Sequence, residues 1–271
     1  MTGQVGQVGR LPLVGLALAA LASGPAEAQA DPPEPFKVAN IHFETNASAC
    51  DMGIQLIFDT EGITEGSVEG PKNKTIYSFR SKGAMRATGG QTEGFLEGIE
   101  PQITELIEAL GCAPSDEEEE VSLDELFEAF PAGVYTFKGK RQGAKFEGEA
   151  TLSHAIPAGA VITAPADGSV VPDAPLLIDW NAVTEPILSS PNLGPVTIVG
   201  YHIVVVEGGG EALPQLDIDV PASATSVTVP AQYLKPNTFY NFEILATEAS
   251  GNQTISEGFF CTTGFDPCEE P

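Results

Sequence analysis

Histidine, cysteine and paired carboxylates are the side chains of this chain whose types and spacing could support chemistry. The three histidines, His42, His154 and His202, are isolated in the sequence and predict neither a metal centre nor a catalytic triad. The G-x-S-x-G, H-E-x-x-H, G-x-x-x-x-G-K and EF-hand patterns of hydrolase, zinc, phosphate and calcium sites do not occur. We therefore expect a protein that is not an enzyme and has no resident metal or cofactor.

Acidic side chains are the best candidate cation ligands. The turn over residues 46–51, which contains Asn46 and Asp51, could join Asp59 and Glu61, because carboxylates on loops can bind calcium. Asn and Asp also simply cap turns, and Asp51 stands next to Cys50. We expect capping here, and a calcium-stabilised structural module is kept as an alternative.

The charge of the chain argues against two classes of partner. Its 271 residues include 12 Lys and Arg against 38 Asp and Glu, a formal net charge of −26. Nucleic acid and anionic lipid are both bound by clustered cations. We expect an acidic, soluble protein with a protein or glycan partner that the sequence does not identify, and expect no nucleic-acid binding and no membrane insertion.

The first 30 residues have the pattern of an export signal. Arg10 precedes an uncharged apolar stretch over residues 11–23, which is too short to span a bilayer. Small residues then follow at the spacing that signal peptidases recognise. We place cleavage after Ala30 and expect the mature chain to be periplasmic or secreted.

Four cysteines, Cys50, Cys112, Cys261 and Cys268, follow this signal. An oxidising compartment favours their pairing, for which three connectivities are possible. Proximity along the chain favours Cys261 with Cys268, which leaves Cys50 with Cys112. No C-x-x-C spacing occurs, so disulfides are expected instead of a zinc or redox site.

Residues 157–263 alternate short β-rich runs with turn residues. The runs cover residues 176–180, 200–206, 225–229, 240–246 and 257–261. Within the fourth run, apolar and polar residues alternate with the period of a half-buried strand. About a hundred residues with this pattern predict an immunoglobulin-like sandwich.

Landmarks within these runs resemble a fibronectin type III domain. Trp180, then Gly200-Tyr201-x-Ile203, then Leu234-x-Pro236-x-Thr238-x-Tyr240 occur in the order that the family shows. The resemblance implies that Trp180, Tyr201, Leu234 and Tyr240 are structural, and that the Tyr240 hydroxyl holds the loop before its strand. It implies no catalytic residue. The connection from Trp180 to Tyr201 is longer than is usual in the family.

The N-terminal half resembles no assigned family, but it repeats the pattern around Tyr240, which we call a tyrosine corner. Pro131-x-x-x-Tyr135-x-Phe137 repeats Pro236-x-x-x-Tyr240-x-Phe242, and the two prolines are 105 residues apart, about one sandwich domain. Strands are expected over residues 38–45, 53–59, 75–80, 133–138 and 144–152. Short helices are expected over residues 103–110 and after the capping box Ser122-x-x-Glu125.

These patterns predict a mainly β protein made of tandem immunoglobulin-like β-sandwiches. We expect a signal peptide over residues 1–30, a β-rich domain with two short inserted helices over 31–155, a fibronectin type III-like domain over 156–264 and a tail over 265–271. This order of halves resembles that of exported bacterial proteins.

Binding or structural spacing through sandwich-end loops is the function that these expectations favour, because such loops carry recognition on a rigid scaffold. The candidate loops cover residues 185–195, 207–211 and 250–253, the last being Ser250, Gly251, Asn252 and Gln253. The alternative from another class is a secreted hydrolase or carbohydrate-active protein with its site in the N-terminal half.

Overall fold

Strands form most of this protein, as the alternation of apolar and polar residues predicts. The computed structural model describes residues 31–115, 119–208, 215–265 and 267–269, so the expected signal peptide lies outside the described residues. The N-terminal half contains β1 (Glu34–Pro35), β2 (Val38–Asn46), β3 (Asp51–Ile63), β4 (Glu65–Gly70), the 3-10 turn η1 (Pro71–Asn73), β5 (Lys74–Arg80), α1 (Gly83–Ala87), β6 (Gln91–Glu97), β7 (Gln102–Ile103), α2 (Thr104–Leu110), β8 (Glu120–Val121), α3 (Leu123–Ala129), β9 (Gly133–Arg141) and β10 (Ala144–Leu152).

The C-terminal half contains strands alone among its described residues. They are β11 (Ile162–Ala164), β12 (Ser169–Val171), β13 (Leu176–Trp180), β14 (Ile198–Glu207), β15 (Gln215–Pro221), β16 (Ser226–Val229), β17 (Phe239–Glu248) and β18 (Gln253–Thr262). The expected mainly β fold with sandwich halves is confirmed. Additions to the expected set include helix α1, a third helix where two were expected, and strands β4 and β6, in which the many Gly and Glu residues hide the alternating pattern.

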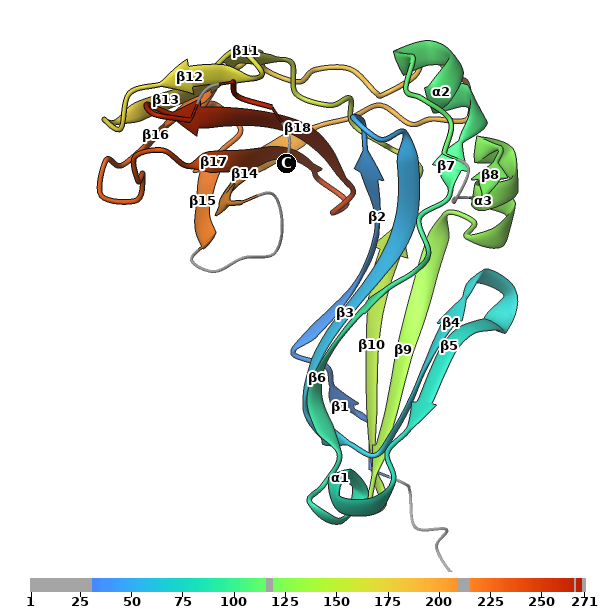
Figure 1. The fold of residues 1–271 in the computed structure, drawn as a ribbon. Helices are drawn as coiled ribbons and strands as arrows, with labels where there is room; N and C mark the ends of the chain where they lie inside the picture. Colours follow the sequence, from blue (N-terminus) through green and yellow to red (C-terminus); the bar gives the residue numbers. More distant parts are fainter. Residues whose placement is uncertain (1–30, 116–118, 209–214, 266, 270–271) are drawn as a thin grey trace, which may run out of the picture. The chain divides into compact units, whose positions relative to one another are not determined.

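Two layers of strands enclose the N-terminal core (Figure 1). One layer has the order β1-β10-β9-β4-β5, and the other is formed by β2, β3 and β6. Helix α1 follows β5 and precedes β6, so it lies where the chain passes from one layer to the other. The aromatic side chains fully buried between the layers are Phe43, Tyr135, Phe137 and Phe146. They pack with buried aliphatic side chains such as Ile41 and Leu56, and the burial of this apolar surface stabilises the half.

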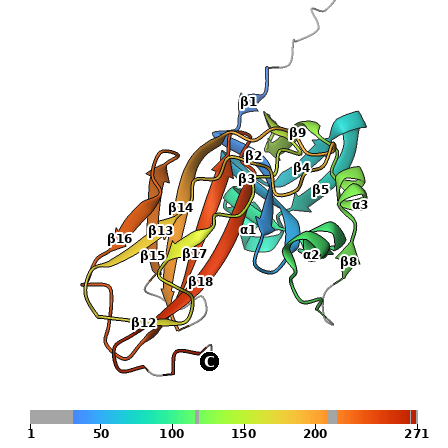
Figure 2. The same ribbon diagram turned by 90° about the horizontal axis from the view of Figure 1, so that it is seen from above.

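The C-terminal half has the same construction around a second core (Figure 2). Strands β11, β13 and β16 form one sheet, and β15-β14-β17-β18 form the other. Trp180 is 2% exposed and packs edge-on against Tyr201, with 5.3 Å between the ring centroids. Tyr240, Phe242 and Phe260 are buried in the same core together with aliphatic side chains such as Ile178 and Ile203. Trp180, Tyr201, Tyr240 and Leu234 are all buried in this core.

A buried tyrosine hydroxyl holds the loop before its strand in each half. Tyr135 donates to the carbonyl of Pro131 at 3.0 Å. The Tyr240 hydroxyl accepts from the backbone N–H of Lys235 at 2.8 Å and lies 3.3 Å from the carbonyl of Tyr233. Burial raises the pKa of Tyr135 to about 12, so its hydroxyl remains a donor at neutral pH.

Local signals explain the two helices that were expected. Helix α2 begins at Thr104 and ends before Gly111, whose φ of 81° is a left-handed conformation that favours glycine. Helix α3 has a complete capping box, in which Glu125 N–H donates to the Ser122 hydroxyl and Ser122 N–H donates to the Glu125 carboxylate. Leu106 of α2 and both Leu123 and Phe127 of α3 pack in the N-terminal core.

Each half of the chain contains one disulfide. Cys50–Cys112 connects the turn between β2 and β3 to the residue pair after α2, and Cys261–Cys268 connects β18 to the tail. This is the pairing favoured by proximity along the chain. The first disulfide closes a loop of 62 residues, which constrains the unfolded chain more than the second, with a separation of 7.

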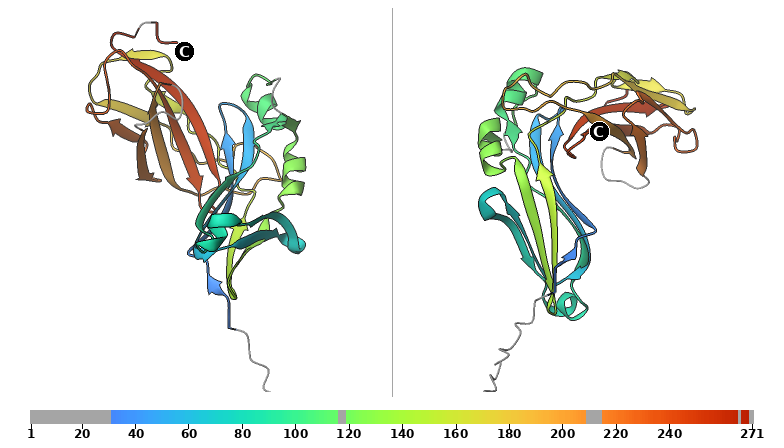
Figure 3. Two further views of the ribbon diagram at one scale, coloured as in Figure 1. Left: turned by 60° about the horizontal axis from the view of Figure 1, so that its bottom comes forward. Right: turned by 180° about the vertical axis from the view of Figure 1, so that it is seen from behind.

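The two cores are joined within one compact unit that starts at Pro33. Strand β18 pairs in parallel with β2, so one sheet runs from β15 through β18 into β2 and β3. The long connection between Trp180 and Tyr201 contributes Ile187 and Leu193 to the N-terminal core. Figure 3 shows this connection from two further sides. Its unusual length is thus explained by what it packs against.

The buried indole of Trp180 predicts a large loss of stability on truncation. Trp180→Ala should lower the free energy of unfolding by about 3 to 5 kcal/mol, because it leaves a cavity in the C-terminal core. Val199→Ala, at a position that is 54% exposed, should change it by less than about 0.5 kcal/mol. Urea denaturation of both variants measures the difference. An unchanged midpoint for Trp180→Ala would contradict the assigned register of β13.

Candidate functional site

The loop expected to carry recognition, residues 250–253, joins the two halves instead of standing free. Asn252 is fully buried, and its carbonyl oxygen accepts from the backbone N–H of Phe43 at 2.9 Å. Its amide nitrogen donates to the carbonyls of Ser153 and Ala155, each at 3.1 Å. Asn252 therefore offers no surface to a partner.

The remaining residues of this loop also have contacts within the chain. Ser250 donates to Glu248 and shares a 2.6 Å hydroxyl contact with Ser153. Gln253 donates to the carboxylate of Glu44 on β2. Gly251 has φ of 101°, the left-handed conformation needed for the tight turn between β17 and β18. Ser250, Gly251 and Gln253 keep part of their surface exposed, and recognition through them stays a prediction.

The loop over residues 185–195 is likewise packed against the N-terminal half. Backbone hydrogen bonds connect Ile187 to Ile156 at 3.0 Å and Gly194 to His154 at 3.1 Å. Asn192 extends the contact by donating to Asp124 at 2.7 Å. In the third candidate loop, Glu207 pairs with Lys235, while residues 209–211 lie outside the described residues.

The expected cation ligands of the N-terminal half do not converge. In the hairpin of β2 and β3, Asn46 pairs with Asp51, whereas Asp59 pairs with Val38 at the far end. The two groups are therefore eight residues apart along the ladder, about 26 Å. The Asn46 side chain accepts from the N–H groups of Ser48 and Ala49, which is the capping role. This separation corrects the calcium site assembled from both segments.

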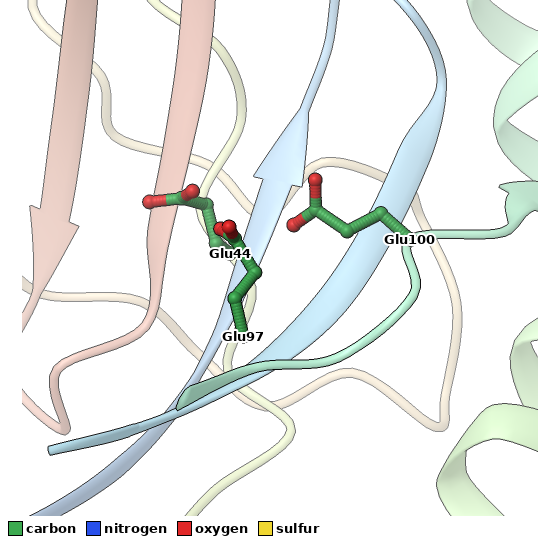
Figure 4. Close-up of side chains that lie close together, drawn as sticks. All are labelled: Glu44, Glu97 and Glu100. Carbon is green, nitrogen blue, oxygen red and sulfur yellow. The ribbon is translucent and has the colours of Figure 1, made fainter. Parts of the chain in front are cut away.

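A different carboxylate cluster lies on the outer face of β2, β3 and β6, and the sequence analysis did not find it. The oxygens of Glu44, Glu97 and Glu100 lie within 4.8 Å of one another. Figure 4 shows the three side chains pointing toward one another from β2, the end of β6 and the segment after it. Glu100 lies over Gly53, where an added Cβ would come within 2.5 Å of its Cγ.

Amide donors occupy oxygens that a cation would need in this cluster. Gln55 Nε2 donates to Glu44 at 2.7 Å and to Glu97 at 2.8 Å, and Gln253 donates to Glu44. Burial raises the pKa of Glu44, the charge of Glu97 raises it further, and the amide hydrogen bonds lower it. The geometry fits a hydrogen-bonded polar network that joins β18 to β2 and β3.

The histidines lie apart from one another and make contacts typical of structural residues. Burial lowers the pKa of His42, which favours its neutral form. His154 stacks on Phe127 with 3.7 Å between ring centroids. Their hydrogen-bonding partners are Gln55 for His42 (3.0 Å), the Phe130 carbonyl for His154 (3.0 Å) and Asp219 for His202 (2.8 Å). The Asp217 carboxylate lies 3.4 Å from the other ring nitrogen of His202.

At the end of the C-terminal half away from residues 250–253, the connecting loops carry exposed polar side chains. Residues 172–175 precede β13, and residues 230–238 join β16 to β17 at the same end, because Leu176 pairs with Val229. The side chains of Asp173, Gln232 and Asn237 are exposed there. The Tyr240 hydroxyl fixes the loop over residues 230–238 by accepting a hydrogen bond from the Lys235 backbone N–H. This end therefore combines exposed polar groups with an ordered backbone.

In the part of the chain that the structure describes, no helix has the length and apolar character needed to cross a membrane.

Comparison with known proteins gives structural neighbours only. No protein-family model and no curated protein matches the chain. The chicken CNTN1 FN1–FN3 domains match at 11% identity with a TM-score of 0.30, over 85% of this chain and 65% of that chain, which is less than two thirds of its length. A two-domain fibronectin type III segment of chicken tenascin matches at 11% identity with a TM-score of 0.27, over 83% and 97%. An FN3 domain of human collagen XX matches at 16% identity with a TM-score of 0.26, over 39% and 88%. The fold assignment rests on the strand order and the two cores described above.

Removal of the Asn252 amide should destabilise the protein strongly. Asn252→Ala leaves the Phe43 N–H and two carbonyls unpaired in a buried place, which should cost about 3 kcal/mol. Asn192→Ala is the matched control, because its amide contact is exposed and should be worth about 0.5 kcal/mol or less. Chemical denaturation measures both. Equal losses for the two variants would contradict the buried role of Asn252.

The pKa of Glu44 predicts a pH dependence of stability with a definite sign. Because its folded pKa is raised above the ordinary 4.5, its contribution to stability falls as pH rises from 4.5 through the folded pKa. The free energy of unfolding of Glu44→Gln minus that of the unchanged protein should therefore increase with pH in this window. Lost hydrogen bonds shift that difference by a constant.

Glu61 serves as a control, because its pH dependence of stability should have the opposite sign to that of Glu44. Its hydrogen bond to Lys37 lowers its pKa, so its contribution to stability is lost as pH falls below 4.5 through the folded pKa. For Glu61→Gln the same difference should decrease as pH rises through that lower window. Denaturation of both variants between about pH 3 and pH 7 tests this. A flat difference for Glu44→Gln would show that the carboxylate is not perturbed by burial.

Proposed function

We propose that this protein is an exported, non-catalytic module with a fibronectin type III-like C-terminal half. It either binds a protein or glycan partner or acts as a structural spacer. The observation that supports the proposal most is the unequal use of its loops. At one end of the C-terminal sandwich the loop over residues 250–253 packs in the junction, and at the other end Asp173, Gln232 and Asn237 are exposed in the loops over residues 172–175 and 230–238. We assign recognition to that exposed end.

Two further features support the other parts of the proposal. The two disulfides are typical of an oxidising compartment, in agreement with the signal pattern of residues 1–30. His42, His154 and His202 are each held by a different partner, and none of the three is hydrogen-bonded to a Ser, Thr or Cys side chain among the described residues. A binding role for an exported protein requires neither nucleophile nor base.

Affinity capture with loop variants tests the proposal. Residues 31–271 are used as bait against the envelope and medium of the source. Asp173→Arg with Gln232→Arg places two cations on the exposed loops and should abolish capture while leaving the melting temperature unchanged. Thr228→Arg, at an exposed position on β16, is the control and should capture normally. Capture that survives the loop substitutions, or an absence of any captured partner, would contradict recognition at this end.

A further inference from the structure

Basic side chains gather on one face of a strongly acidic protein. Nine of the 12 Lys and Arg residues lie between Lys72 and Lys145. Several of them form a row across the outer face of the sheet β10-β9-β4-β5, where Lys145 pairs with Lys140, Lys140 with Glu65, and Glu65 with Arg80. We call Lys145, Lys140, Glu65 and Arg80 the basic row.

The basic row has more positive than negative charge. Glu65 is shared by Arg80 at 3.3 Å and Arg86 at 3.4 Å, which leaves Lys140 and Lys145 without a carboxylate in this row. These two lysines are exposed and stand directly opposite each other, an arrangement that costs stability unless an anion lies between them. The row is therefore suited to a partner that presents carboxylates.

A hollow of about 620 Å³ opens beside the basic row. It lies over the paired residues Ser67 and Ser78, whose short side chains leave space between Arg80, Lys138 and Lys140. Lys138 and Arg80 face this space together with their ion-pair partners, Glu69 at 2.6 Å and Glu65 at 3.3 Å. Lys140 is the lining cation with no ion pair among the described residues, and a cation at this edge would favour an aromatic ring. The hollow thus fits a large apolar side chain flanked by negative charges.

Strand β6 presents that combination on the other layer of the same sandwich. Glu93, Phe95 and Glu97 alternate on its outer side, opposite Asp59, Ile57 and Gln55 of β3. Phe95 is 62% exposed, although most aromatic side chains of this half are buried. We call Glu93, Phe95 and Glu97 the acidic knob.

The dimensions of the two surfaces agree. Four residues along a strand separate Glu93 from Glu97 by about 13 Å, at about 3.3 Å per residue. Three strand spacings separate Arg80 from Lys145 in the basic row by about 14 Å, at about 4.8 Å each. An aromatic side chain between the glutamates can enter the hollow over Ser67 and Ser78 while a flanking carboxylate approaches Lys140 on its edge.

We propose that the acidic knob of one copy docks on the basic row and hollow of a second copy. Phe95 fills the hollow over Ser67 and Ser78, and Glu93 and Glu97 pair with cations of the row. The two surfaces are on the outer faces of opposite layers, so one copy cannot satisfy both alone. Such a head-to-tail contact leaves a free surface at each end and repeats, which gives chains longer than dimers. The proposal does not depend on the binding role assigned above.

Complementary variants of residues 31–271 test this contact. Phe95→Ser removes the knob, and Lys140→Glu with Lys145→Glu removes the row. Sedimentation of the unchanged protein should show species larger than a dimer as its concentration rises from about 10 µM to about 1 mM, a range typical of small interfaces. Each variant alone should associate at least about tenfold more weakly. An equal mixture of the two should form one-to-one dimers and nothing larger, since only one productive pair of surfaces remains.

Two controls separate this contact from general effects of charge and hydrophobicity. Lys72→Glu with Lys74→Glu changes the net charge by the same amount outside the hollow, and Val199→Ser removes an exposed apolar side chain from β14. Both should associate like the unchanged protein. A monomeric unchanged protein at about 1 mM would overturn the proposal. So would a mixture of the complementary variants that stays monomeric, or controls that lose association equally.

Discussion

The buried amide of Asn252 is the interaction on which the arrangement of the two sandwiches depends. It connects the N–H of a β2 residue with the carbonyls of the segment after β10, so three separate stretches of chain meet at one side chain. An amide at this place has to be fully paired, because an unpaired donor or acceptor in a buried position costs more than a made hydrogen bond gains. The requirement fixes the turn between β17 and β18 against the N-terminal half.

The same requirement extends through the sheet next to it. Parallel pairing of β18 with β2 aligns Gln253 with Glu44, and the antiparallel hairpin aligns His42 with Gln55. Gln55 then donates to Glu44 and Glu97, so polar side chains on four strands form one network. The partial burial of Glu44, which raises its pKa, is a consequence of this junction. The cluster of carboxylates is thus explained by how the halves meet, without a ligand.

Local patterns were sufficient to predict most strands, the capping box and both tyrosine corners. These features depend on residues within one strand, one helix turn or one loop, so alternation and spacing reveal them. The carboxylate cluster was missed for a different reason. Glu44 and Gln55 are brought together by hairpin register, and Glu97 belongs to β6, whose Gly94 and exposed Phe95 disguise the strand. Contacts between strands distant in sequence cannot be read from composition.

The loop over residues 250–253 is a second case in which contacts between distant parts of the chain could not be predicted from local sequence. Ser, Gly, Asn and Gln are typical of exposed turns, and an isolated sandwich would present them to solvent. Here a second sandwich covers them, and the residue best suited to bind a partner, Asn252, instead satisfies the backbone of its own chain. The long connection after Trp180 was the one visible sign of this, because a loop that exceeds the needs of its own sandwich must pack elsewhere. The junction therefore leaves the loops at the other end of the C-terminal sandwich as the ones to which we assign recognition in the proposed function.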